Sequence, residues 1–357
     1  LFQLLYLGGV PDHAAVDESV ELVKRASPAG AGLVNAVLRR ASREGAGMLA
    51  ELNDLTPEGA ATMHSVPQWL AARLWDELGA DPARAVLRRA NEPAESALRV
   101  NTLVSTVERA IAGVPVPARR SVDLPEALVL EGPFDVHGSE LWRSGTVFPQ
   151  SRASMLVARV LEPGPGEDVL DLCAAPGAKT THLAALMEDR GAIRAVERHP
   201  GRARALVETC ARMRAGCVRV RTADAVMLAG RTEFDRVLVD PPCSGLGTLQ
   251  SRPDLRWRMT SEAIEQLIAA QARILRAGAE ATRPGGSLVY SLCTISRAES
   301  HCVLERFLAE RPDFSAEDLG AEYSQLADER CGRYLQLLPH RDLTDGFFIA
   351  RLRRRTA

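Results

Sequence analysis

EDVLDLCAAPGAKTTHLAALME, residues 167–188, contains a short apolar run, a turn with Gly and Pro, and an apolar helix pattern. The alternation continues to residue 293 through GAIRAVE, PGRARALVETCARMRA, CVRVRTAD, FDRVLVDPP, SEAIEQLIAAQARILRAGAEAT and GSLVYSLC. Strand-like runs between helices of this length predict βαβ units and a parallel sheet with helices on both faces. We therefore expect a doubly wound, Rossmann-like α/β domain over residues 147–357. The last two apolar runs, RYLQLLPH and DGFFIARLRR, predict an antiparallel hairpin at its edge.

Two segments with other sequence patterns precede this domain. VDESVELVKRA (16–26) and GAGLVNAVLRRAS (30–42) carry apolar residues at three- and four-residue spacing, which predicts a helical domain over residues 1–47. From Ser96 onward, short β-favouring runs alternate with Pro, Gly and Asp, so we expect a small α+β domain over residues 64–146. The opening LFQLLYLGGVP resembles the interior of a helix, and we expect that the first residues of the helical domain are missing from this sequence.

Composition excludes several classes of protein. With 46% hydrophobic and 25% charged residues, the chain has the composition of a globular protein, and it contains no apolar run of 18 residues that could span a membrane. Its net charge of −2 provides no general attraction for nucleic acid, so local basic patches would have to bind it. The candidates for such patches are Arg39, Arg40 and Arg43, and Arg252, Arg256 and Arg258 with Trp257.

The cysteines and histidines do not predict a metal site or a disulfide framework. The seven cysteines include no CxxC pair, and the seven histidines are scattered. This usage indicates a reducing cytoplasm. We expect Cys210, Cys217, Cys302 and Cys331 to be small buried hydrophobic residues.

Ligands of doubly wound sheets bind at the carboxyl ends of the strands. The loop Cys173–Lys179 follows the first strand, and Glu197 and Asp224 close the next two. These acids could merely cap the helices that follow them. Together with Asp171 at the end of the first strand, these make three acids at successive strand ends. Three acids with one Gly-containing loop, and without GxGxxG or a P-loop, instead suit a cationic nucleoside without phosphates, and S-adenosylmethionine fits that description.

Cys243 and Cys293 follow the fourth and fifth strands and should lie at this same edge. At least one of them is expected to be a nucleophile, since a thiol there faces the ligand. Lys179 could favour a thiolate, although a simple surface lysine is an equal alternative.

DLCAAPGAKT, VDPPCSG and YSLCT, in this order, resemble the RNA (cytosine-5)-methyltransferases of the NOL1/NOP2/Sun family over residues 145–357. VDESVELVKR and GLVNAVLRR resemble the NusB-like RNA-binding domain that is fused to family members acting on 16S ribosomal RNA, and PQWLAARL and LRVN fit their middle domain. The resemblance implies the class I S-adenosylmethionine-dependent methyltransferase fold. It also implies methylation of C5 of a cytosine in RNA, most plausibly small-subunit ribosomal RNA, and not in DNA, whose enzymes use a single cysteine in a PC loop.

The resemblance also implies roles for individual residues. Cys293 would add to C6 of the cytosine, Cys243 would assist release of the product, and Asp240 would bind the N3/N4 edge of the base. The cofactor would be held by Cys173, Ala174, Ala175, Pro176, Gly177, Ala178, Lys179, Glu197, Asp224 and Asp240.

Other functions stay open at this point. A transfer RNA cytosine could be the substrate, or the chain could be a non-catalytic RNA-binding or antitermination factor, against which the intact PPC and TC cysteines argue. A Rossmann oxidoreductase would need GxGxxG where this chain has CAAPGAK. We expect an RNA partner, no membrane and a monomer.

Overall fold

The computed structural model describes residues 1–357 except 229–233, 329–330 and 357. It divides into two compact units, Leu1–Arg84 and Ala85–Ala357. Helices make up the secondary structure described in the first unit: α1 (Phe2–Tyr6), α2 (Asp12–Ala26), η1 (Pro28–Gly30), α3 (Ala31–Ala50), α4 (Pro57–Met63) and α5 (Gln68–Leu78), while α6 (Ala80–Arg89) crosses the boundary. The two helices predicted over 16–26 and 30–42 are confirmed, and each is longer than predicted.

The second unit begins with a small antiparallel sheet in the order β2-β3-β1-β4. Its elements are β1 (Ala97–Val100), α7 (Val107–Ala112), β2 (Ala118–Arg120), β3 (Ala127–Leu130), α8 (Glu140–Arg143) and β4 (Val147–Pro149). Apolar side chains of β1 and β3, such as Leu98 and Leu128, pack with α7 in a core of their own. This confirms the mixed α and β structure that was predicted from Ser96 onward.

The larger sheet has the order β10-β12-β9-β8-β5-β6-β7, and β11 pairs with β12 outside this path. The strands are β5 (Asp168–Asp171), β6 (Ala192–Glu197), β7 (Val218–Thr222), β8 (Phe234–Val239), β9 (Thr282–Leu292), β10 (Phe314–Ala316), β11 (Leu335–Leu337) and β12 (Phe347–Arg354). Strands β5 to β9 pair in parallel. The predicted doubly wound α/β fold is therefore confirmed.

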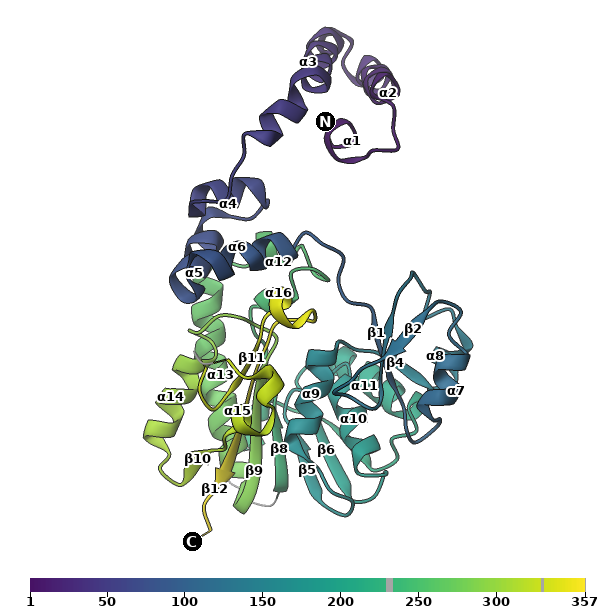
Figure 1. Ribbon diagram of the computed structural model, residues 1–357. Helices are drawn as coiled ribbons and strands as arrows, with labels where there is room; N and C mark the ends of the chain where they lie inside the picture. Colours follow the sequence, from purple (N-terminus) through teal and green to yellow (C-terminus); the bar gives the residue numbers. More distant parts are fainter. Residues whose placement is uncertain (229–233, 329–330, 357) are drawn as a thin grey trace. The chain divides into compact units, whose positions relative to one another are not determined.

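Helices cover both faces of this sheet (Figure 1). They are α9 (Arg152–Leu161), α10 (Ala178–Leu186), α11 (Pro200–Arg212), α13 (Ser261–Ala281) and α14 (His301–Glu310), with shorter pieces η2 (Ala225–Leu228), η3 (Leu246–Thr248), α12 (Leu255–Arg258), α15 (Leu319–Glu322), η4 (Ser324–Leu326) and α16 (Pro339–Asp342). Successive strand residues point to opposite faces, so Val169 packs with α9, α10 and α11, whereas its neighbour Leu170 packs with α13 and α14.

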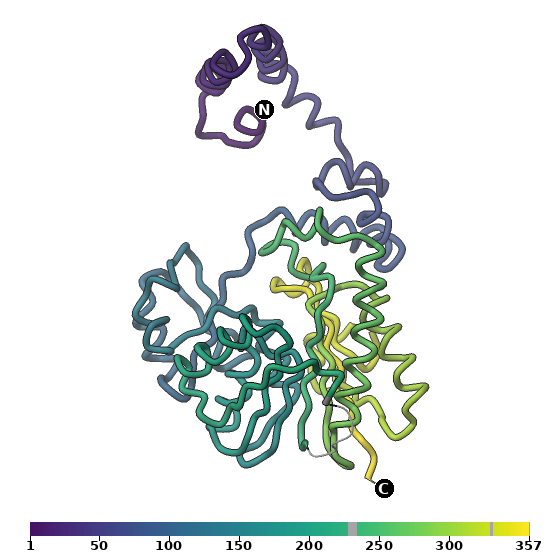
Figure 2. Tube along the Cα trace, turned by 180° about the vertical axis from the view of Figure 1, so that it is seen from behind, coloured from purple at the N-terminus to yellow at the C-terminus, as the bar shows by residue number. Residues whose placement is uncertain are grey.

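The predicted antiparallel C-terminal hairpin at the edge of the sheet is confirmed. β11 pairs antiparallel with β12 and with no other strand described. β12 is the inner strand of the hairpin, because it also pairs with β9 along six residues and with β10 beside β11. The yellow C-terminal strand runs alongside the green chain of β9 in both views (Figures 1 and 2). Phe348 and Ile349 of β12 are fully buried, which explains why this run is continuously apolar instead of alternating.

Arg99 joins the small sheet to the larger domain. Its guanidinium is fully buried and donates to Gln150 Oε1 (2.9 Å) and to Thr181 Oγ1 of α10 (2.7 Å). Burial lowers the pKa of Arg99 to about 9. Asn101, two residues on, donates to the Met213 carbonyl at the end of α11 (2.8 Å). The LRVN segment therefore anchors β1 to the helices that flank the ligand edge.

The close packing of α13 on the sheet predicts opposite effects for two Gly→Ala substitutions. A Cβ at Gly278 would lie 2.5 Å from Val239 Cγ2 in the core, whereas one at Gly201 in α11 meets nothing within 4 Å. Overpacking costs about 1–3 kcal/mol, which exceeds the roughly 1 kcal/mol that Ala gains over Gly in a helix. We expect Gly278→Ala to lower and Gly201→Ala to leave or raise the free energy of unfolding in urea. Equal effects of the two would contradict this packing.

Candidate active site

The parallel strands bring the predicted ligand residues to one edge of the sheet. Asp171 of β5 pairs with Leu238 of β8, and Val239 pairs with Tyr290 of β9, so these strands end at nearly the same level. A backbone hydrogen bond extends the pairing of β5 and β6 past the end of β5, because the Ala174 N–H donates to the Val196 carbonyl (2.9 Å). The loops that carry the predicted cofactor residues and both cysteines therefore begin at the same edge of the sheet.

The two candidate cysteines are in direct contact. Cys243 Sγ lies 3.3 Å from Cys293 Sγ, although 50 residues separate them in the chain. Backbone bonds join their loops: Gly247 N–H donates to the Cys293 carbonyl (3.1 Å), and Gly346 N–H donates to the Gly247 carbonyl (2.8 Å). A Cβ at Gly247 would lie 1.9 Å from the Gly346 carbonyl oxygen, so only glycine permits this approach. Three loops thus converge behind the sulfur pair.

The surroundings of the two thiols differ in charge. The hydrogen bond from Cys243, together with the positive charge of Lys179, lowers the pKa of Cys293 against the opposing effects of burial and Asp240. The pKa of Cys243 is raised well above its ordinary value by the same bond, by burial and by the negative charge of Glu299. Of the two residues, Cys293 is thus the one whose thiolate form is favoured, and Cys243 is the one whose thiol form is favoured.

Lys179 lies within this site with only 14% of its side chain exposed, so the alternative of a simple surface lysine was wrong. Its Nζ donates to Asp240 Oδ2 (2.8 Å) and lies 5.1 Å from the centre of the Phe347 ring. Burial alone would lower the pKa of Lys179, but Asp240 holds it above its ordinary value. Asp240 Oδ1 accepts a second bond from Ser291 Oγ (2.8 Å). Lysine and carboxylate are therefore fixed beside the reactive sulfur.

The loop from Cys173 to Lys179 passes along the ends of β5 and β6. Arg202 of α11 donates to the Ala175 carbonyl in this loop (2.7 Å). Gly177 adopts a left-handed conformation (φ 106°) immediately before α10, whose first N–H groups have no partner within the helix. Burial raises the pKa of Cys173, so this thiol stays protonated.

The predicted acids lie at the expected strand ends. Glu197 is buried at the end of β6, and its Oε1 accepts a bond from His199 N–H (2.8 Å). Asp224 follows β7, is exposed, and accepts a bond from Val226 N–H through Oδ1 (3.0 Å). The alternative capping role therefore holds for Asp224, which binds an N–H of η2, but not for Glu197, because α11 has no side-chain cap. Each of the two bonds uses only one carboxylate oxygen.

This set of donors and acceptors fits a cationic nucleoside without phosphates. Carboxylates at successive strand ends favour positive charge and ribose hydroxyls, and free N–H groups of α10 can bind polar ligand atoms. The Arg202 guanidinium, which would be needed to clamp a phosphate, is occupied by the Ala175 carbonyl and lies 3.6 Å from Glu197. The residues present are thus compatible with S-adenosylmethionine.

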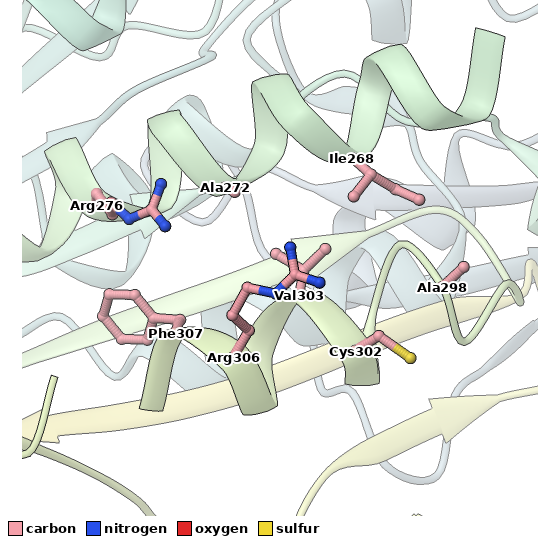
Figure 3. Close-up of a pocket in the computed structure, with 8 residues that line it drawn as sticks. All are labelled: Ile268, Ala272, Arg276, Ala298, Cys302, Val303, Arg306 and Phe307. Carbon is pink, nitrogen blue, oxygen red and sulfur yellow. The ribbon is translucent and has the colours of Figure 1, made fainter. Parts of the chain in front are cut away.

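Cys302 does not have the buried position that was predicted, although Cys210, Cys217 and Cys331 do. It is exposed because it lies on the side of α14 opposite Val303 and Leu304, which face the sheet. It borders a cavity of about 240 Å³ between α13 and α14 (Figure 3). The cavity is lined by Ile268, Ala272, Arg276, Ala298, Cys302, Val303, Arg306 and Phe307 and contains no residue predicted for the site.

One of the predicted RNA contacts is wrong. Arg256 is 6% exposed, and its guanidinium donates to the Ala90 carbonyl and to Asn91 Oδ1, so it is structural. Its neighbours Trp257 and Arg258 are exposed and can reach a ligand. Trp257 in particular is 63% exposed, which is unusual for so large an apolar side chain.

The arginines predicted to contact RNA in the first unit are exposed on α3. Arg39 donates to Asn35 Oδ1, and Arg40 pairs with Glu44. Arg43 is also exposed. Their positions are compatible with the prediction but do not test it.

Other site residues were not predicted from the sequence. Ser291, Phe347 and Glu299 contact or surround the predicted residues, but each lies in a run that reads as ordinary strand or loop. Among the described residues, no cluster of His, Cys, Asp and Glu could hold a metal ion. No helix in the described part of the chain has the length and hydropathy needed to cross a membrane.

Comparisons with known proteins cover the whole chain. Residues 158–353 match the family described as 16S rRNA methyltransferase RsmB/F, residues 1–43 match the NusB family, and residues 66–137 match the RsmF/B-like ferredoxin-like domain. The chain is 36% identical over 370 residues to the probable ribosomal RNA small subunit methyltransferase B of Bacillus subtilis, which covers 99% of this chain and 81% of that protein.

Two solved structures are similar to nearly the whole fold. The crystal structure of PH0851 has a TM-score of 0.81 at 30% identity and covers 96% of this chain and 77% of its own. The structure of NSun6 from Pyrococcus horikoshii with SFG has a TM-score of 0.74 at 25% identity and covers 82% of this chain and 99% of its own.

The lowered pKa of Cys293 predicts its reactivity as a function of pH. Because its thiolate form is favoured, iodoacetamide should alkylate Cys293 at a lower pH than it alkylates an ordinary thiol, while the raised pKa of Cys243 protects that residue. Removing the cation in Lys179→Met should raise the pKa of Cys293, shift the alkylation profile to higher pH and slow the reaction severalfold at pH 7. Mass spectrometry of the two peptides measures this.

Lys24→Met is the matched control, because Lys24 is exposed and pairs with Glu21 in the first unit. It should leave the profile unchanged. An unshifted profile in Lys179→Met would show that the lysine does not favour the thiolate.

Proposed function

Because the chain belongs to the RsmB/F family of 16S rRNA methyltransferases, we propose that it methylates C5 of a cytosine in 16S ribosomal RNA through a covalent cysteine–C6 adduct. Family membership makes it an S-adenosylmethionine-dependent ribosomal RNA methyltransferase. The choice of cytosine C5 is carried by one observation, the contact at the ligand edge between two cysteine sulfurs, of which Cys293 has a lowered pKa. C5 of cytosine is a poor nucleophile, and addition of a thiolate to C6 is what activates it.

S-adenosylmethionine, when bound, supplies an electrophilic methyl group. The residues that would hold it are the loop Cys173–Lys179 with Glu197, Asp224 and Asp240. The buried Glu197 carboxylate keeps one oxygen free of the His199 bond and suits the ribose hydroxyls. The loop backbone and the first N–H groups of α10 suit the polar end of the ligand.

Cys293 begins the chemistry on the base. Its thiolate forms a bond to C6, and the electron pair of the C5–C6 double bond moves toward C5 and N3. Asp240 accepts a hydrogen bond from the N4 amine, and the proton taken up at N3 is supplied through this carboxyl group from Lys179, which already donates to it. The base then carries no net charge and has a nucleophilic C5.

Cys243 completes the reaction after C5 has been methylated. The C5 proton must leave so that the C5–C6 double bond can form again and the Cys293 sulfur can depart as a thiolate. Once Cys293 is bonded to carbon, Cys243 no longer shares its proton with that sulfur and loses the proton to solvent. As a thiolate it then accepts the C5 proton, since the two sulfurs are only 3.3 Å apart in the free protein, and one proton is released for each methyl group transferred. The proton at N3 returns to the Lys179–Asp240 pair.

Access to C6 and C5 requires a base that is unstacked or extruded from a helix. The exposed Trp257 offers a ring on which a base can stack, and Arg252 and Arg258 can contact phosphates beside it. Arg39, Arg40 and Arg43 of α3 provide a second group of possible phosphate contacts.

We also propose domain bounds, a location and an assembly state for the chain. We divide the chain into a NusB-like RNA-binding part (1–47), a small α+β part (64–146) and the catalytic part (147–357). We place the protein in the cytoplasm, where its free thiols stay reduced, and propose that it acts as a monomer on RNA and not on DNA.

Cofactor binding is tested at Asp224. Loss of a hydrogen bond to the ligand in Asp224→Ala should cost about 1–3 kcal/mol of binding free energy, measured by calorimetry with S-adenosylmethionine. Asp254→Ala, which removes another exposed acid on a loop, should leave the affinity unchanged. Equal affinities for the wild-type protein and a folded Asp224→Ala variant would remove Asp224 from the cofactor site.

The covalent mechanism is tested by separating the two cysteines. The wild-type protein with labelled S-adenosylmethionine should produce 5-methylcytosine in 16S ribosomal RNA in preference to transfer RNA. Cys293→Ala should abolish both turnover and adduct, because C6 is never attacked. Cys243→Ala should accumulate a protein–RNA adduct that survives a denaturing gel and disappears with ribonuclease, because release is impaired.

The converse pattern would reverse the two roles. Normal turnover by both single variants would exclude covalent catalysis by these cysteines. Cys302→Ala, which alters an exposed thiol on α14, serves as the control and should methylate normally.

A further inference from the structure

Glu299 is a buried carboxylate behind the two cysteine loops. It precedes α14, is 0% exposed, and lies six residues beyond Cys293 in the chain. Four hydrogen bonds satisfy it. Oε1 accepts from Ser244 N–H (2.8 Å) and from Gln271 Nε2 (3.0 Å), and Oε2 accepts from Ser244 Oγ (2.5 Å) and from Thr294 Oγ1 (3.0 Å).

These donors connect Glu299 to both reactive sulfurs. Ser244 follows Cys243 directly in the chain, and Thr294 follows Cys293 directly. The two hydroxyl oxygens also lie 2.9 Å apart, because both face the same carboxylate oxygen. One carboxylate therefore holds the residue next to each cysteine.

Two further contacts fix the surroundings of the carboxylate. Gln271 of α13, which donates to Glu299, also donates to the Pro242 carbonyl, one residue before Cys243 (3.0 Å). Tyr290 of β9 donates a hydrogen bond from its hydroxyl to the backbone carbonyl of Glu299 (2.9 Å). Glu299 is thus attached through its side chain to α13 and through its backbone to β9.

We propose that Glu299 is a positioning residue that holds the Cys243 and Cys293 loops at the separation needed for the two sulfurs to exchange a proton. Its role in methylation rests on the proposed covalent mechanism, whereas its effect on the distance between the sulfurs does not. A carboxylate suits this position because it accepts through both oxygens, and the backbone N–H of Ser244 and the amide NH₂ of Gln271 can only donate.

The charge of Glu299, like its hydrogen bonds, favours a pair in which Cys243 is the thiol. It lies on the Cys243 side of the pair and helps to keep that residue a thiol, while Lys179 lies near Cys293 and favours the thiolate there. Burying an ion is costly unless its hydrogen bonds are satisfied, and four donors satisfy this one. Such an arrangement would not be needed merely to fill space.

The distance between the sulfurs can be measured chemically without RNA or cofactor. Phenylarsine oxide reacts with two neighbouring thiols, forming two As–S bonds and releasing one water, and it does so tightly only when both sulfurs can reach the same arsenic. Titration of the full chain, followed by mass spectrometry of the bridged peptides, reports whether Cys243 and Cys293 remain side by side. Cys243→Ala should abolish this bridge.

Two variants of Glu299 distinguish the loss of its hydrogen-bond acceptors from the loss of its charge. Glu299→Ala removes all four acceptor contacts and should weaken the arsenical bridge about tenfold or more. Glu299→Gln keeps an oxygen for Ser244 N–H and Gln271, while its NH₂ faces two hydroxyl groups that can turn to accept, so the bridge should persist at nearly wild-type affinity. Glu126→Ala, which removes another buried, hydrogen-bonded glutamate, should lower stability without weakening the bridge.

The proposal is overturned if folded Glu299→Ala binds the arsenical as tightly as the wild-type chain, or if Glu299→Gln loses the bridge as completely as Glu299→Ala. Should Glu299→Ala fail to fold, the double variant Ser244→Ala, Thr294→Val removes the two hydroxyl donors instead. It should also weaken the bridge, and an unchanged bridge in it overturns the proposal.

Methylation assays complete the test. Glu299→Ala should lower kcat and leave the KM for RNA unchanged, because Glu299 does not face the RNA, and Glu299→Gln should largely restore kcat. If the chain does not methylate cytosine at all, the arsenical result is unaffected, so failure of the proposed function and failure of this proposal are distinguishable.

Discussion

The parallel pairing of β8 between β5 and β9 is the constraint on which the site depends. Parallel strands end at one edge, so every loop that leaves a carboxyl end starts at the same side of the sheet. The CAAPGAK loop, the PPC loop and the TC loop leave three adjacent strands and therefore meet. The burial of both faces of the sheet by helices makes this edge the place where polar side chains can converge.

Convergence alone does not place two sulfurs in contact. The backbone bonds among Gly247, Cys293 and Gly346 draw three loops together, and the last of these belongs to the segment that leads into β12. β12 is antiparallel to β9, so its amino-terminal end lies at the carboxyl edge of the parallel strands. An antiparallel strand inside the sheet thus contributes Phe347 beside Lys179, which a purely parallel sheet could not do.

Charge then gives the two cysteines different properties. Both sulfurs are sheltered from water, and burial by itself disfavours either thiolate. Lys179 on one side and Glu299 on the other break this symmetry, because Lys179 lowers the pKa of Cys293 and Glu299 raises the pKa of Cys243. Asp240 holds the lysine in place while presenting a carboxylate to the site. The same few ionic groups therefore set both the positions and the protonation states of the reactive atoms.

The sequence by itself determined the α/β fold, the strand ends and the pair of cysteines, because these depend on periodicity and on motifs that are local in the chain. It did not determine that Arg256 is buried against Ala90 and Asn91 or that Cys302 is exposed, because burial of a single side chain depends on which distant segment packs against it. The role of Glu299 is of the same kind. Its four donors come from three separate segments, and only the tertiary structure brings them within hydrogen-bonding distance of one carboxylate.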